Sequence, residues 1–203
     1  MGDTPGHYFD AEPGVTSAPG EVRLDLPDRS LRLATDRGVF SGERVDAGTK
    51  YLLLEAPVPP PVGIFVDLGC GYGPIACTLA ARAPGATVWA VDVNRRAVEL
   101  CRANAEALGL GNVRAVEADE VPDDLAVALI WSNPPIRIGK ARLHELLTTW
   151  LNRLTPTGSA LLVVQKHLGA DSLQRWLSEQ GWVVGRVGAR TGYRLLQVGR
   201  EQP

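Results

Sequence analysis

The stretch from Ile64 to Ala80 reads IFVDLGCGYGPIACTLA, and the expected fold follows from it. An apolar run that contains Asp67 is followed by glycines at three alternate positions, Gly69, Gly71 and Gly73, and then by an Ala/Leu-rich pattern. This order predicts a buried parallel strand, a tight loop and the start of a helix. Because glycine has no Cβ, the backbone of such a loop can approach a ligand closely. We therefore expect a nucleotide-like ligand at the tips of the strands, over the glycines.

The spacing of the glycines distinguishes between two classes of nucleotide-binding loop. Loops that bind dinucleotides have the pattern G-x-G-x-x-G and point a helix N-terminus at a pyrophosphate. Here the third glycine comes one residue early. Asp67, two residues before the first glycine, would repel phosphate, and a carboxylate at this place suits a cationic ligand instead. The order D-x-G-x-G-x-G resembles the first motif of class I S-adenosylmethionine (SAM) methyltransferases, whose ligand carries an ammonium and a sulfonium group.

The composition is that of an ordinary globular protein. The chain has 203 residues, 45% of them hydrophobic and 22% charged, which is enough for one α/β core. It contains no apolar run of the roughly 20 residues that cross a membrane, and it does not begin like a secretory signal. Its three cysteines have no C-x-x-C spacing, so neither a disulfide framework nor a metal site is predicted. We expect a cytoplasmic protein that uses neither a membrane nor a metal.

Charge is distributed unevenly along the chain. The net charge is −2, but residues 137–200 contain ten Lys and Arg against three Asp and Glu. A basic half of this kind can form a face that attracts phosphate groups. Alternatively, these side chains are the solvated ends of helices and strands, and the sequence leaves both interpretations open.

The first 60 residues are predicted to precede the main core. Residues 1–20 are rich in Gly, Pro and Ser, and we expect them to be loosely ordered, with an anchor at His7, Tyr8 and Phe9. Residues 21–203 are expected to form a single domain.

Within that domain, residues 21–60 should form a hairpin and a helix ahead of a Rossmann-like core over 61–203. Apolar and polar residues alternate over 22–26 and 31–34 around a turn, which predicts a β-hairpin. A short helix over 50–55 is expected to stop at a proline cluster.

From Ile64 onward, predicted strands and helices alternate with short links. Strands are expected over 64–68, 87–91, 113–117, 127–131, 160–165, 183–187 and 195–198, and helices over 74–83, 95–108, 141–154 and 172–179. This alternation is typical of a doubly wound, mostly parallel sheet. The link between the last two strands is too short for a helical crossover, so they must be antiparallel neighbours. The expected α/β fold is therefore the Rossmann-like class I methyltransferase fold, with seven mostly parallel strands, an antiparallel last strand and the N-terminal hairpin.

Acidic residues follow the second and third strands of this core. Asp92 ends the second strand, where a carboxylate can accept hydrogen bonds from both hydroxyls of a ribose. Alternatively Asp92 caps the next helix, a role that Asn94 could also fill. Asp119 follows the third strand, where SAM methyltransferases place an acid beside the adenine amino group. Glu117 and Glu120 compete for that role, and all three can instead be solvated acids.

The tetrapeptide Ser132-Asn133-Pro134-Pro135 directly follows the fourth strand of the core. Asn-Pro-Pro alone is a rigid turn, but after this strand it resembles the catalytic motif of amino-directed methyltransferases. An exocyclic amine on a purine is a poor nucleophile because its lone pair is delocalised into the ring. The Asn133 side-chain oxygen and the Pro134 carbonyl can accept its two hydrogens and favour a pyramidal nitrogen, and proline brings no competing donor. The sulfonium methyl is already activated, so the protein has to supply positioning and charge stabilisation.

Several other segments narrow the resemblance to one family. The segments that carry it are 40–41, 45–50, 133–140, 164–166, 169–170 and 192–194. They are similar to the small methyltransferase domain family, whose best-described members are 16S ribosomal RNA (guanine-N2)-methyltransferases, and the resemblance covers roughly residues 7–198. It implies that Asn133, Pro134 and Pro135 form the catalytic loop. The residues that it assigns to SAM binding are Asp46, Thr49, Asp67, Gly69, Cys70, Gly71, Gly73, Asp92, Val93, Asp119 and Asn133.

The resemblance also implies ribosomal RNA, free or in the small subunit, as the partner. Arg137, Lys140 and Lys166 would contact phosphates around a flipped-out or single-stranded guanine. Many family members have an aromatic residue after the two prolines, and here that residue is Ile136. Stacking is worth about 1–3 kcal/mol per base, so Tyr193 or Phe40 would have to supply the aromatic surface, or the target differs. The predicted substrate-binding residues are Ile136, Arg137, Lys140, Lys166 and Tyr193.

These features together predict a SAM-dependent methyltransferase that acts on guanine N2 of 16S ribosomal RNA. Two other reactions are compatible with Asn-Pro-Pro, namely methylation of adenine N6 and of a protein glutamine N5. Relatives of those kinds usually have Asn-Pro-Pro-Tyr. The third alternative is a non-catalytic RNA-binding factor for ribosome assembly. Asp67, Asp92 and Asn133 speak against it, because binding alone needs none of them.

Overall fold

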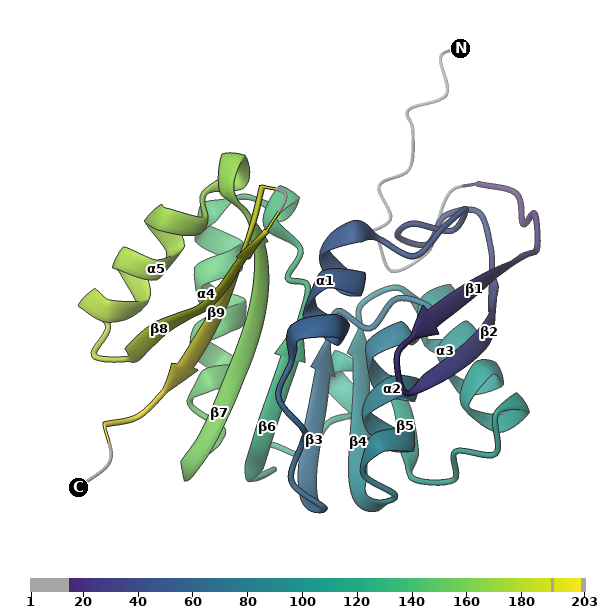
Figure 1. The fold of residues 1–203 in the computed structure, drawn as a ribbon, viewed down its shortest axis with the longest axis horizontal. Helices are drawn as coiled ribbons and strands as arrows, with labels where there is room; N and C mark the ends of the chain where they lie inside the picture. Colours follow the sequence, from purple (N-terminus) through teal and green to yellow (C-terminus); the bar gives the residue numbers. More distant parts are fainter. Residues whose placement is uncertain (1–14, 191, 202–203) are drawn as a thin grey trace.

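A twisted sheet runs through the middle of the molecule with helices on both of its faces (Figure 1). This computed structural model describes residues 15–190 and 192–201. The expected anchor at His7, Tyr8 and Phe9, and most of the loosely ordered segment predicted over 1–20, lie outside the described residues. No helix within the described ranges is long and apolar enough to cross a membrane.

The sheet has seven strands in the order β5-β4-β3-β6-β7-β9-β8. Their bounds are β3 Val62–Leu68, β4 Gly85–Asp92, β5 Val113–Glu117, β6 Val127–Ser132, β7 Leu154–Gln165, β8 Val183–Arg190 and β9 Tyr193–Gly199. Neighbouring strands are parallel from β5 to β7, and β9 runs antiparallel to both β7 and β8. The fold predicted from the sequence, with its antiparallel last strand, is therefore confirmed.

Helices cover the two faces of the sheet and create two apolar cores. On one face lie α1 (Ala47–Glu55), α2 (Pro74–Arg82) and α3 (Arg95–Ala107), and on the other α4 (Lys140–Leu151) and α5 (Ala170–Glu179). Consecutive residues of a strand point to opposite faces. Phe65 of β3 accordingly packs in the core under α1 to α3, whereas Val66 packs in the core under α4 and α5.

The predicted hairpin is formed by β1 (Gly20–Leu26) and β2 (Arg29–Thr35), which pair antiparallel. Its inward side chains, among them Leu24 and Leu33, are buried in the same core as α2 and α3. Asn104 of α3 accepts a hydrogen bond from Ala34 N–H (2.7 Å) and donates one to Ala34 C=O (2.9 Å). The hairpin thus packs on α3 and does not extend the main sheet.

The boundaries predicted on the two sides of the link between α4 and β7 are wrong. The helix expected over 141–154 ends at Leu151, and the strand expected over 160–165 begins at Leu154. Leu154 pairs with Val127 of β6, and the register then shifts before Leu129 pairs with Ser159. A Cβ on Gly158 would lie 2.8 Å from the Val127 carbonyl oxygen, so only glycine fits this irregular stretch. The partner strand, which is distant in sequence, determines where β7 starts.

Candidate active site

β3 and β6 are neighbours at the centre of the sheet. After β3 the chain continues to β4 on one side of the pair, and after β6 it continues to β7 on the other side. Asp67 of β3 pairs with Trp131 of β6, with β4 and β5 on one side and β7 to β9 on the other. The loops that follow two such strands part and leave a crevice, where ligands of open α/β sheets bind. A cavity of about 420 Å³ opens at this place, a size typical of small-molecule sites.

The glycine loop after β3 forms the floor of this cleft. The backbone N–H groups of Gly69 and Cys70 both donate to the Val91 carbonyl of β4, at 2.8 and 3.0 Å. Gly73 has φ +92° and caps α2, and a Cβ there would lie 2.6 Å from Cys101 Sγ of α3. The early third glycine is thus explained by the close approach of α2 and α3.

Asp92 is held in the cleft at the end of β4. Its two carboxylate oxygens accept hydrogen bonds from Gly71 N–H (2.9 Å) and Asn94 N–H (3.0 Å). The cap of α3 is Asn94, which accepts from Ala97 N–H at 3.3 Å, so Asp92 is not needed for capping. Burial raises the pKa of Asp92. A polar group in a half-enclosed cleft gains from a ligand that supplies further donors, and the two hydroxyls of a ribose are such donors.

Asp67 does not line the cleft, in contrast to the role that we expected for it. Its side chain is fully buried, and one carboxylate oxygen accepts a hydrogen bond from Ala76 N–H of α2 at 2.8 Å. Burial raises its pKa to about 8. The acid of the glycine motif therefore ties β3 to the start of α2, and its effect on a ligand passes through the loop that it supports.

A small recess adjoins the cleft beside the glycine loop. It is lined by Asp46, Thr49, Tyr72 and Asn133 among others. The Tyr72 hydroxyl is buried and has no hydrogen-bond partner among the described residues, and burial raises the pKa of this phenol. An unpaired buried donor is costly, so a ligand group that fills the recess would relieve it. The Tyr72 hydroxyl can donate a hydrogen bond to a ligand carboxylate such as that of the SAM amino-acid end.

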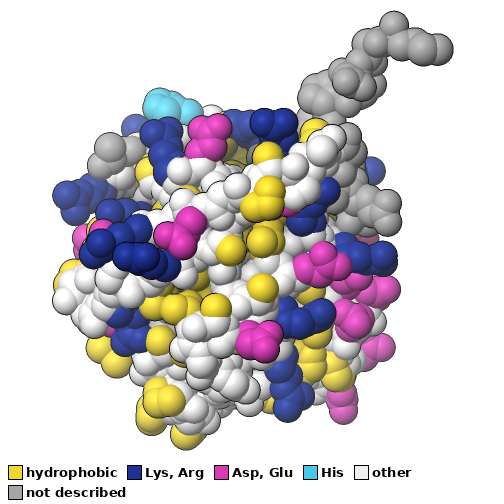
Figure 2. Space-filling view, turned by 90° about the vertical axis from the view of Figure 1, so that its right-hand side faces the viewer, with side chains coloured by type: hydrophobic (Ala, Val, Ile, Leu, Met, Phe, Trp, Pro, Cys, Tyr) yellow, Lys and Arg dark blue, Asp and Glu magenta, His cyan; other side chains and the backbone are white. Residues whose placement is uncertain are grey.

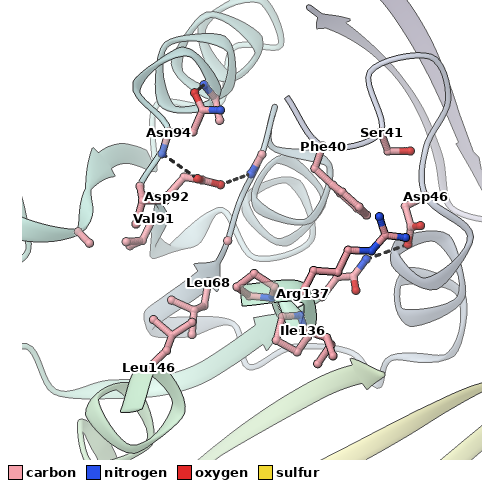
Figure 3. A pocket seen from close by; sticks show the side chains of 18 of the residues that line it. Phe40, Ser41, Asp46, Leu68, Val91, Asp92, Asn94, Ile136, Arg137 and Leu146 are labelled. Atoms are coloured by element: carbon pink, nitrogen blue, oxygen red, sulfur yellow. Dashed lines mark hydrogen bonds between the residues drawn. The ribbon is translucent and has the colours of Figure 1, made fainter. Parts of the chain in front are cut away.

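The rest of the cleft suits a nucleoside. Val93, Ala118 and Leu146 line it with apolar side chains. Figure 3 shows Leu146 and the Asp92 carboxylate on this part of the wall. Asp119 is exposed on the 3₁₀ turn Ala118–Glu120 and does not line the cleft, so the structure does not bring it to the predicted adenine site.

The Asn-Pro-Pro loop forms the opposite wall. The Ser132 hydroxyl donates to the Leu68 carbonyl at 2.6 Å and so joins the ends of β6 and β3. A Cβ on Gly69 would lie 3.8 Å from Pro135 Cδ, so the glycine loop and the Asn-Pro-Pro loop lie next to each other. The Pro134 carbonyl accepts a hydrogen bond from Ile136 N–H at 2.8 Å. A carbonyl oxygen has two lone pairs, so one remains for a substrate.

The predicted substrate-binding residues divide into two groups. Ile136, Arg137 and Tyr193 line the cleft itself, and Figure 3 shows the Arg137 side chain reaching toward Asp46. Lys140 is the first residue of α4, and Lys166 directly follows β7; both are exposed and lie at the rim rather than in the lining.

Tyr72, Ala118, Leu146 and Trp150 belong to this site although no sequence motif predicted them there. Tyr72 lines the recess, and the other three line the cleft. Tyr72 lies inside the glycine motif, and this position was a signal that could have been used. Leu146 and Trp150 belong to the apolar pattern of α4, which predicts only burial.

The basic residues of the C-terminal half lie on the elements around β7 to β9, at one end of the sheet. Figure 2 looks onto the right-hand side of Figure 1, where the hairpin lies, and basic and acidic side chains are interspersed on that face. Arg137, Lys140 and Lys166 form no ion pair with any described residue, whereas Arg186 pairs with Asp171 at 2.8 Å. The cations beside the cleft are therefore available to an anionic ligand.

A glycine loop, a carboxylate after β4 and an Asn-Pro-Pro loop after β6, arranged around one cleft of this fold, define a SAM-dependent methyltransferase. Residues 30–197 match the sequence model of the methyltransferase small domain, and the chain belongs to that family.

Two relatives and one solved structure show how near the similarity is. The chain is 35% identical over 194 residues to the uncharacterized protein YbxB of Bacillus subtilis, covering 94% of this chain and 96% of that protein. It is 30% identical over 162 residues to the ribosomal RNA small subunit methyltransferase C of Shewanella amazonensis, covering 77% of this chain and 47% of that one. It thus spans about half the length of that relative.

The fold is similar to that of the T. thermophilus 16S rRNA N2 G1207 methyltransferase RsmC in complex with AdoMet and guanosine. The TM-score is 0.78 at 23% identity, over 93% of this chain and 52% of that one. At this identity the similarity establishes the shared fold.

Proposed function

We propose that this protein transfers the methyl group of SAM to the N2 amine of a guanine in 16S ribosomal RNA. The observation that carries the proposal is the pair of acceptors beside the cleft. The Asn133 side-chain oxygen makes no hydrogen bond among the described residues, and the Pro134 carbonyl keeps one lone pair. Two acceptors match the two hydrogens of an exocyclic amine.

The chemistry needs little from the protein beyond this placement. Bound SAM supplies a methyl group that its sulfonium activates for transfer. Asn133 and Pro134 accept the amine hydrogens and direct the nitrogen lone pair toward the methyl carbon, so that the N–C bond forms as the S–C bond breaks. The methylated nitrogen then releases one proton to solvent. Asp92 would hold the ribose of SAM, and the recess that contains the Tyr72 hydroxyl would hold its amino-acid end.

Three observations support RNA as the substrate. Beside the cleft lie three cations that form no ion pair with any described residue, namely Arg137, Lys140 and Lys166. They are therefore able to bind phosphate groups. Phe40 and Tyr193 both line the cleft and can supply the aromatic face that Ile136 does not. The names of the relative and the structural neighbour described above include ribosomal RNA. An enzyme with this substrate would work in the cytoplasm.

Methyl transfer from labelled SAM tests the proposal. Wild-type protein and N133A are incubated with naked 16S RNA, with 30S subunits and with a release factor, and the RNA is digested and analysed by mass spectrometry. We expect N2-methylguanosine from one of the RNA substrates, and none from a transcript in which inosine, which lacks the N2 amine, replaces guanosine. N133A should be at least 100-fold slower.

The other outcomes identify the alternatives. N6-methyladenosine would indicate an adenine enzyme, and label in the release factor would indicate a protein glutamine methyltransferase. SAM binding without transfer to any substrate would favour a non-catalytic assembly factor. Each of these three results would contradict the proposed reaction.

A further inference from the structure

The amide of Asn133 is held by the first turn of α1, which lies far from it in the sequence. Asn133 Nδ2 donates to Asp46 Oδ1 at 2.8 Å and to Thr49 Oγ1 at 3.0 Å. Figure 3 shows the bond at Asp46 as a dashed line on the wall of the cleft. Asp46 Oδ1 also accepts a hydrogen bond from Thr49 N–H at 3.0 Å and caps α1. The cap and the clamp on Asn133 are thus one structure.

These contacts decide which way the amide faces. A carboxylate has only acceptors, so it requires the NH₂ group of the amide and not its oxygen. With both contacts made through Nδ2, the oxygen is directed away from α1. It has no hydrogen bond among the described residues, and Asn133 lines the cleft. Asp46 and Thr49 hold the NH₂ end of the Asn133 amide. They therefore leave its oxygen as the acceptor for a substrate amine.

The first turn of α1 is itself fixed against the sheet. A Cβ on Gly48 would lie 2.6 Å from Tyr193 Cε1 and 3.0 Å from Asp46 Oδ1, so the Tyr193 ring packs directly on this turn. Thr49 is 4% exposed and does not line the main cleft. Its buried hydroxyl therefore serves Asn133 more directly than it could serve a ligand in the main cleft.

We propose that Asp46 and Thr49 are positioning residues, which orient the Asn133 amide so that its oxygen faces the substrate amine. This inference rests on the proposed function, because that function makes the Asn133 oxygen an acceptor in the reaction. It also differs from the role in SAM binding that the family resemblance implies for Asp46 and Thr49. The two roles predict different kinetic effects.

Two pairs of variants separate the roles. D46A and T49V each remove one hydrogen bond to Asn133, and we expect kcat to fall at least 10-fold while the Kd for SAM changes less than 3-fold. D46N keeps a side-chain oxygen that can cap α1 and accept from Asn133. T49S keeps the hydroxyl, and both should recover most of the lost kcat. If D46N lost SAM affinity as strongly as D46A, with kcat unaffected in both, the charge of Asp46 would be acting on SAM and the positioning role would be refuted.

A double-mutant cycle tests whether the effect passes through Asn133. In the N133A background, T49V should reduce kcat by less than 2-fold, because the group it positions is gone. A full 10-fold loss in that background would contradict the inference. K50G serves as the control for the helix, since it weakens α1 at an exposed position without touching the clamp, and should lower Tm but not kcat.

A measurement without substrate keeps this inference separate from the proposed function. The side-chain NH₂ signal of Asn133, assigned in ¹⁵N-labelled protein by its absence from N133A, should exchange with solvent at least 10-fold more slowly than that of exposed Asn152. D46A should remove this protection, and D46N should retain it. Exchange as fast as that of Asn152 would refute the clamp. If the wild type methylates none of the substrates, the proposed reaction fails while this test still stands.

Discussion

The Asp67 carboxylate accepts a hydrogen bond from the backbone N–H of Ala76 at 2.8 Å, which joins the end of β3 to the first turn of α2. The other carboxylate oxygen has no partner among the described residues, and the side chain is fully buried. Burial accordingly raises its pKa to about 8. The acid of the glycine motif therefore acts on the stability of the fold around the cleft.

This raised pKa predicts that stability falls with rising pH. Free aspartate has a pKa of about 3.9, so between pH 4 and 8 the folded chain keeps a proton that the unfolded chain has released. The free energy of unfolding should then decrease by up to about 1.4 kcal/mol per pH unit across this window. D67N has no proton to lose and should show a shallower decrease, measured by urea unfolding at pH 5, 6, 7 and 8.

The decrease should not vanish in D67N, because burial also raises the pKa of Asp92 and this residue remains. D124N, at an exposed position, serves as the control and should follow the wild-type curve. If D67N and the wild type have the same slope, Asp67 is ionised in the folded protein and the burial argument is wrong.

Asp92 should dominate the affinity for SAM. Hydrogen bonds to a charged group are worth about 1.5–3 kcal/mol, so D92A should bind SAM at least 10-fold more weakly by isothermal titration calorimetry. The same loss should appear as a smaller rise of Tm on adding SAM. E99Q, an exposed change on α3, should bind like the wild type. If D92A bound SAM as tightly as the wild type, the prediction that the ribose binds at the end of β4 would be wrong.

Asn104 should be essential for the docking of the hairpin. Its buried amide makes the two hydrogen bonds to Ala34 and donates a third to the Tyr72 carbonyl at 2.8 Å, so it also supports the glycine loop. N104A leaves the buried Tyr72 carbonyl unpaired, at a cost of about 1–3 kcal/mol, and removes the two part-buried hydrogen bonds to Ala34. We expect Tm to fall by about 5 °C or more in calorimetry. N152A, at an exposed position, should stay within about 0.5 kcal/mol of the wild type.

Lys140 should contribute to RNA binding through phosphate contact alone. K140A is expected to weaken binding at low salt and to reduce the slope of log K against log salt by about 0.7, as for one contact with a single strand. R32A provides a matched control, because Arg32 is exposed on β2 at the other end of the molecule. Unchanged binding by K140A at 50 and 200 mM salt would exclude Lys140 from the interface.

The fold could be predicted in detail because its signals are local. Alternating apolar residues predicted β1 and β2, and the strand Val113–Glu117 was predicted with its observed bounds. The loops after β3 and β6 were expected at adjacent strand tips, and the structure brings Asn133, Asp92 and Gly71 to one cleft. In each case the pattern lies within a few residues, or follows from the strand order of the fold.

Only the tertiary structure decided what Asp67 and Asp46 contact. Both are acids of the predicted SAM site, yet Asp67 is buried against α2, and Asp46 binds an amide 87 residues further along the chain. Asp119, also expected there, is exposed on its 3₁₀ turn. The local sequence pattern determines which strand or loop carries an acidic residue. The group that this residue contacts depends on how the helices pack across the sheet. That packing sums many weak contacts between distant residues, and no short motif records it.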